Sequence, residues 1–165
     1  MNLSEAAARA DELAQQGAER ELAQLRSQWQ DELESAARSR DYRERAAAYR
    51  AIGQFRWRAK EELLRRGLDD ESPACRGSAL ISLELLSRDH PSSVNAARSL
   101  LHSIVSSDGN EAVRRLAILC LKNGSPQRDT IVLLQGIAEE EGLDRGVKET
   151  ASKVAAGLDK RSKTR

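Results

Sequence analysis

The sequence predicts an all-α fold, and three observations support that prediction. Hydrophobic residues make up 39% of the 165 residues and aromatic residues only 3%, with three prolines and an excess of Ala, Leu, Arg and Glu, all good helix formers. Apolar residues recur at helical spacing along most of the chain. A similar group of residues also returns every 30 to 40 residues, a period typical of an α-solenoid built from helix pairs.

Residues 1–37 lie outside this period and predict an N-terminal helical extension. A helical face runs through Leu22, Trp29 and Leu33, and a thinner alanine-rich stripe precedes it. Gly17 separates the two stripes, so one long helix or two shorter ones are expected. We expect this amphipathic extension to pack on the first helix pair, with its second helical stretch as the cap.

The repeat is clearest in "DDESPACRGSALISLELL" (69–86) and "SDGNEAVRRLAILCLKNG" (107–124). Each stretch has an Asp six residues before an Arg and an Ala three residues after that Arg. The matched positions are Asp70 and Asp108, Arg76 and Arg114, and Ala79 and Ala117. Ala79 and Ala117 are expected where helices approach closely, and Leu83, Leu116 and Leu119 are expected in the core.

A basic anchor residue marks each of four units. The anchors are Arg45, Arg76, Arg114 and Lys148, separated by 31, 38 and 34 residues. We expect each to lie near a turn, where it reaches an acidic group or exposed carbonyls of a neighbouring unit. A leucine pair follows each of the first three anchors in a second helical segment and is expected to fill the space between helix layers: Leu63-Leu64, Leu100-Leu101 and Leu133-Leu134.

The order of Asp, Pro, an apolar-Arg pair and Ala in 69–86, and of Asp, Val-Arg and Ala in 107–124, resembles the HEAT repeat family. The resemblance implies a right-handed α-solenoid of three to four helix pairs over residues 38–158. It also implies a concave surface lined by the second helices, where binding is expected. Residues 159–165 form a basic stretch without any apolar residue, so this tail is expected to be disordered. Ser72-Pro73, Asn110 and Ser125-Pro126 predict helix starts, and Gly124 and Gly142 predict helix ends.

No residue pattern predicts catalysis, a cofactor or a metal site. His90 and His102 lack a Cys, Asp or Glu at the spacing of a zinc or hydrolase site. Cys75 and Cys120 lie in apolar surroundings and are expected to be buried free thiols. Because no residue is a candidate nucleophile with a recognisable base, an enzyme is not expected. The sequence has neither a membrane-spanning apolar run nor a signal peptide, so a cytoplasmic protein without membrane contact is expected.

The net charge is +1, but charge is distributed unevenly along the chain. Residues 1–37 carry a net charge of −5, residues 38–66 of +6 and residues 148–165 of +4. Within the first basic zone, "DYRERAAAYRAIGQFRWRAK" (41–60) holds four of the five aromatic residues. Its candidate binding residues are Arg43, Tyr49, Arg50, Arg56, Trp57, Arg58 and Lys60.

Two interpretations of this segment follow. In one, the aromatic side chains are buried against the N-terminal extension and the arginines stay solvated. In the other, the basic face binds an acidic protein or a phosphate backbone.

The leading functional prediction is a non-catalytic protein-binding or scaffold module, a monomer or weak oligomer whose partner is another protein. The alternative is a nucleic-acid-binding protein that uses residues 38–66, since a DNA glycosylase family also resembles a HEAT solenoid, although none of its catalytic residues can be matched here. A third class is an accessory subunit of an enzyme, such as the HEAT-like phycobilin lyases.

Overall fold

The computed structural model describes residues 1–164, and Arg165 lies outside the described residues. Within that range the chain forms ten α-helices and one short 3-10 helix, with no β-strand. The all-α prediction is therefore confirmed. No helix among these residues is both long enough and apolar enough to span a membrane.

The chain divides into two compact units, Met1–Leu86 and a second unit that begins at Ser87. Residues 1–37 thus share a unit with the helices that follow them. The helices of the first unit are α1 (Leu3–Gln16), α2 (Glu19–Ala37), α3 (Tyr42–Gln54), the 3-10 helix η1 (Arg58–Lys60), α4 (Glu61–Leu68) and α5 (Pro73–Ser87), whose last residue belongs to the second unit. The helices of the second unit are α6 (Ser92–Ala96), α7 (Arg98–Ser107), α8 (Glu111–Leu121), α9 (Arg128–Ala138) and α10 (Arg145–Lys163).

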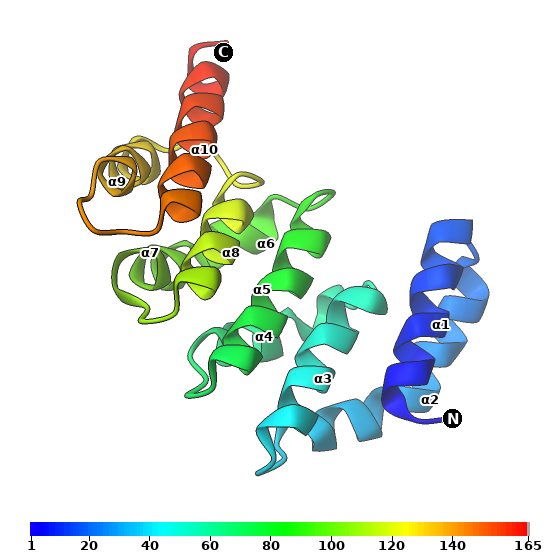
Figure 1. The fold of residues 1–165 in the computed structure, drawn as a ribbon. Coiled ribbons are helices and arrows are strands. Elements are labelled where there is room, and N and C mark those ends of the chain that lie inside the picture. The colour runs from blue at the N-terminus through cyan, green and yellow to red at the C-terminus, as the bar shows by residue number, and fades with distance from the viewer. Residues whose placement is uncertain (165) are drawn as a thin grey trace. The chain divides into compact units, whose positions relative to one another are not determined.

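Two helices form the N-terminal extension. Asn2 and Glu5 make a reciprocal capping box at the start of α1, and Gly17 ends that helix with a φ of 72°. Both α1 and α2 pack on α3 (Figure 1). The extension therefore covers α3 with two helices rather than with the second alone.

Small residues bring α5 close to α3 and α4. The Ser82 Oγ accepts a hydrogen bond from the Gly53 backbone N–H at 3.0 Å and donates to the Tyr49 carbonyl at 2.6 Å. A Cβ atom on Gly67 would lie 2.9 Å from the Ala79 Cβ. The expectation that Ala79 marks a close helix approach is confirmed.

In the second unit, α8 packs against α7 and α10, and α10 also packs along α9. Figure 1 shows α10 beside both α8 and α9. Ala117 is fully buried, as expected. Of the three predicted leucine pairs, the second member is buried in each: Leu64, Leu101 and Leu134. The first members are partly exposed, Leu100 the most, at 36%.

Two of the three helix starts predicted from the sequence are observed in the structure. Helix α5 begins at Pro73, and Asn110 caps α8 by accepting a hydrogen bond from the Val113 N–H at 3.0 Å. The predicted start at Ser125-Pro126 was wrong, because α9 begins at Arg128. Ser125 instead exchanges two hydrogen bonds with the Asn95 side chain, at 2.9 and 3.0 Å, so its hydroxyl does not cap a helix.

Helix α10 continues through residues 159–163, where a disordered tail was predicted. The Arg161 guanidinium donates to the carbonyls of Lys122 and Gly124, both at 2.9 Å. Asp159 and Lys163 also form an ion pair one helical turn apart, at 3.1 Å. These contacts hold the end of the helix without any apolar side chain, and apolar side chains were the only criterion behind the prediction of disorder.

Candidate functional site

The aromatic residues of the 41–60 segment are mostly buried inside the first unit. Tyr49, Phe55 and Trp57 expose at most 7% of their surface, whereas Tyr42 is half exposed. The rings of Phe55 and Trp57 lie 5.4 Å apart, centre to centre. Tyr49 and Trp57 were candidate binding residues, and their burial leaves little ring surface for a partner to stack on.

The N-terminal helices hold the backbone that carries these rings. The Arg26 guanidinium of α2 donates to the carbonyls of Phe55 and Arg56, at 2.8 and 3.1 Å. Arg56 has a left-handed backbone, with a φ of 51°. Its side chain bonds the Asp11 carboxylate of α1 at 2.8 Å and two carbonyls at the end of α3.

Most candidate cations of this segment have an acidic partner within the unit. Lys60 binds the Glu34 carboxylate, which lowers the pKa of Glu34, and lies 5.5 Å above the Trp57 ring. Arg43 pairs with Asp41 at 3.2 Å, and Arg58 lies 3.7 Å from Glu61. The structure therefore ties Arg56 to α1 and Lys60 to α2, and the Lys60 ammonium lies over the buried Trp57 ring.

Arg50 is the exception among the candidates. Its Nη1 atom is buried and has no hydrogen-bond partner. Arg50 lies one turn before the end of α3, near the Ser82 contact, because Ser82 Oγ is 3.1 Å from the Arg50 carbonyl. A single buried nitrogen does not define a ligand site.

The anchor arginines bind carbonyls and carboxylates at helix ends, and Arg45 reaches an acidic group of the next segment, as expected. Arg45 of α3 makes a bidentate ion pair with Asp70, just before α5, through contacts of 2.9 and 3.0 Å. It also donates to the Ser39 and Arg40 carbonyls, at 3.1 and 3.2 Å. Burial acts to raise the pKa of Asp70, but hydrogen bonds from Arg45 and the Ser72 N–H hold it below its ordinary value.

The other anchors differ in their partners. Arg76 donates to the Asp70 and Glu71 carbonyls, at 2.9 and 3.2 Å. Arg114 is buried, donates to the Val105 carbonyl at 2.8 Å and lies 3.5 Å from the Glu140 carboxylate. Lys148 is partly exposed in α10 and lies beside a shallow pocket between α9 and α10.

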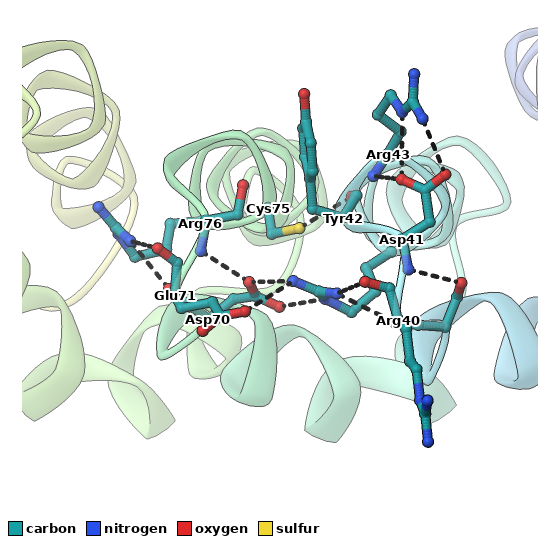
Figure 2. A network of polar contacts seen from close by, with 11 residues as sticks. Arg40, Asp41, Tyr42, Arg43, Asp70, Glu71, Cys75 and Arg76 are labelled. Carbon is teal, nitrogen blue, oxygen red and sulfur yellow. Dashed lines mark hydrogen bonds and ion pairs between the residues drawn. The ribbon is translucent and has the colours of Figure 1, made fainter.

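Neither cysteine is available for surface chemistry. Both are free and fully buried, as predicted. The Cys75 thiol donates to the Tyr42 carbonyl at 3.2 Å (Figure 2), and burial raises its pKa. A low thiolate fraction makes a nucleophilic role unfavourable.

His102 is held in the second unit by Thr130, with 2.8 Å between the imidazole Nε2 and the threonine Oγ1. Burial lowers the pKa of His102, so the neutral ring is favoured. Among residues 1–164, no group of three or more His, Cys, Asp or Glu side chains is placed to hold a metal ion.

A different surface, between α8 and α10, forms a groove. Two adjoining hollows of 610 and 450 Å³ share Arg115 and Leu119 in their walls. The apolar lining comes from both helices: Leu116 and Leu119 from α8, and Val147, Val154 and Leu158 from α10. Along α8 the lining extends from Glu111 to Lys122, about 17 Å at the helical rise of 1.5 Å per residue.

Four cations line the 450 Å³ hollow of this groove: Arg115, Lys122, Lys153 and Arg161. Arg115 donates to the Thr150 hydroxyl at 3.2 Å, and Arg161 bonds the two carbonyls after α8. In the described part of the chain, none of the four has a carboxylate within ion-pair distance. This sets the groove apart from the 41–60 segment, whose cations are mostly neutralised internally.

The groove has opposite charges at its two ends. Glu111 and Asp144 line the end where α8 and α10 begin. Lys122 and Arg161 line the end where both helices finish. The two helices therefore run in the same direction along the groove, with carboxylates at the amino ends and cations at the carboxyl ends.

The sequence prediction missed this groove because Leu116 and Leu119 were expected in the core. Both are partly exposed, and the buried side of α8 is formed by Val113, Ala117, Ile118, Cys120 and Leu121. The available signal was the uninterrupted apolar run at 116–121. Six consecutive apolar residues surround a helix, so one pair of core contacts cannot bury them all.

Comparison with known proteins gave no relative: no family model matches the chain, and neither a curated protein nor a solved structure matches it.

Proposed function

We propose that this chain is a non-catalytic protein-binding module of the HEAT-repeat type, with its helix pairs arranged as a right-handed α-solenoid. It binds its partner through the groove between α8 and α10. The cytoplasm is the proposed location, and two buried free thiols fit a reducing compartment.

The observation that carries this proposal is the apolar groove edged by cations without carboxylate partners. Leu116 and Leu119 are partly exposed, and covering them with a partner removes apolar surface from water, which favours association. The surrounding cations exclude partners of like charge and favour those with carboxylates. A non-catalytic role fits a groove whose charged groups are mainly lysines and arginines.

The 41–60 segment supports the same choice over a nucleic-acid-binding role. Arg56 and Lys60 are paired with Asp11 and Glu34, and Trp57 is buried. These ion pairs would have to break before the cations could contact phosphates. The free energy needed to break them would offset much of the free energy gained by neutralising a phosphate.

Site-specific photo-crosslinking in native lysate tests the proposal. The variant Leu116→p-benzoylphenylalanine places the reactive group at the groove, and Val132→p-benzoylphenylalanine places it on α9, where Val132 is half exposed. Protein adducts are expected at position 116 and not at 132. They should disappear when Lys122→Glu and Lys153→Glu are added.

Adducts at position 132 alone would show that the partner binds α9 instead of the groove. Helix α9 is the second helix of its predicted pair, and the HEAT resemblance implies binding by such second helices. Adducts at neither position would refute protein binding by the second unit.

A further inference from the structure

We infer that the occupant of the α8–α10 groove is an amphipathic helix of a partner protein, acidic in its amino-terminal half, that lies antiparallel to α8 and α10. This inference rests on the proposed function and deepens it by specifying the chemistry and direction of the partner.

The dimensions of the groove fit a short helix. A length of about 17 Å accommodates roughly three helical turns, or eleven to twelve residues. A helix bound in a groove buries apolar residues at positions i, i+4 and i+7. Such residues match a floor formed by Leu116 and Leu119 on one side and by Val154 and Leu158 on the other.

The charge of the groove favours an acidic helix. Lys122 and Lys153 are exposed, and neither has an ion-pair partner among the described residues. Carboxylates on the flanks of a bound helix would reach both ammonium groups while its apolar face covers the floor. A phosphate backbone would satisfy the cations but would leave the leucines exposed to water, so the apolar floor favours a peptide.

The direction of the helix follows from the polarity of the groove. Cations lie at the carboxyl ends of α8 and α10, and Glu111 and Asp144 lie at the amino ends. Carboxylates near a helix amino terminus are stabilised by the helix dipole, so an acidic amino-terminal half is also the more helical arrangement. A partner helix whose amino-terminal half lies over Lys122 runs antiparallel to α8 and α10. Antiparallel helix dipoles attract, so this direction is also favoured electrostatically.

The test uses two synthetic peptides with identical composition and leucines at i, i+4 and i+7. In the first, glutamates occupy the amino-terminal half and lysines the carboxyl-terminal half; in the second, the glutamates and lysines are exchanged. Both are acetylated and amidated, labelled with fluorescein, and titrated with the full chain while fluorescence anisotropy is recorded. We expect the first peptide to bind at least fivefold more tightly than the second, with the difference shrinking as salt is raised.

Variants of the full chain locate the binding. The double change Lys122→Glu and Lys153→Glu should weaken binding of the first peptide at least tenfold. Lys160→Glu is the matched control, because Lys160 is an exposed lysine of α10 that does not line the groove. It should change the affinity less than twofold. Circular dichroism and thermal unfolding verify that each variant is folded, and the peptide comparison on the unaltered chain does not depend on any variant.

Equal affinity for the two peptides, or no effect of the double change, overturns the inference. Tighter binding of a 12-base-pair duplex DNA than of the first peptide at 150 mM salt overturns it in favour of nucleic acid. Self-association in sedimentation velocity that the double change abolishes overturns it in favour of a second copy of the chain. If the photo-crosslinks form but neither peptide binds, the helical partner is refuted while the protein-binding function stands; if no crosslink forms, the function itself fails.

Discussion

Gly53→Ala tests the close packing of α3 on α5. A Cβ atom at position 53 would lie 2.7 Å from the Ser82 Oγ and 2.8 Å from the Ser82 Cα. Carbon atoms pack at about 3.5 Å or more, so the two helices would have to separate by roughly 0.7 Å. The Ser82 hydroxyl cannot avoid this by rotating, because the Cα belongs to the backbone.

The expected magnitude combines opposing effects. Overpacking of this kind costs about 1–3 kcal/mol, and weakening the hydrogen bond from the Gly53 N–H to the Ser82 Oγ adds about 1 kcal/mol. The higher helix propensity of alanine offsets about 1 kcal/mol. The variant should therefore lose roughly 1–3 kcal/mol of unfolding free energy, or about 3–9 °C in Tm for a protein of this size.

Urea unfolding followed by circular dichroism measures this loss. Gly136→Ala is the control, because Gly136 lies within α9 and its added Cβ would meet nothing within 4 Å apart from the adjoining backbone of its own helix. That change should stabilise the protein by about 0.5–1 kcal/mol. If Gly53→Ala also stabilises the protein, the contact of α3 with α5 is not as close as described.

Three further predictions concern pH, backbone strain and fluorescence. Because burial lowers the pKa of His102, its contribution to stability should be complete above about pH 6.5 and be lost as pH falls through the lower folded-state pKa; urea titrations should show this loss, and His102→Gln should reduce it. Arg56→Gly should be less destabilising than Arg56→Ala by about 1 kcal/mol, because only Ala keeps the left-handed strain, and equal midpoints in urea would contradict this. With Trp29→Phe in place, the fluorescence maximum of Trp57 should lie at a shorter wavelength than that of a solvent-exposed tryptophan, and deletion of residues 1–37 should shift it to a longer wavelength. A long-wavelength maximum in the intact chain would show that Trp57 is exposed.

Local signals in the sequence were sufficient to predict much of the fold. Asn110 before an apolar helix and Gly17 between two stripes each act through nearby backbone, so their neighbours along the chain determine the outcome. The expectation that Arg45 reaches an acidic group was also correct. That its partner is Asp70, 25 residues away, could not be read from Arg45 itself.

The candidate site was less predictable because it depends on which apolar faces remain uncovered. Leu119 and Ile118 are adjacent and chemically alike, yet Ile118 is fully buried and Leu119 lines the groove. The rotation of α8 relative to its neighbours decides between them, and helical periodicity does not specify that rotation. The same limit applies to the 41–60 segment, where the acidic partners of Arg56 and Lys60 come from α1 and α2.

The pairing of Arg45 with Asp70 has a consequence for how such a chain can grow during evolution. The arginine lies on α3 and its carboxylate immediately before α5, so one ion pair joins two successive segments. A tandem duplication of the segment that holds both residues would supply a new arginine together with its own matching acid. Insertions by whole segments therefore preserve the junctions, whereas a deletion that begins between the two residues separates an arginine from its partner.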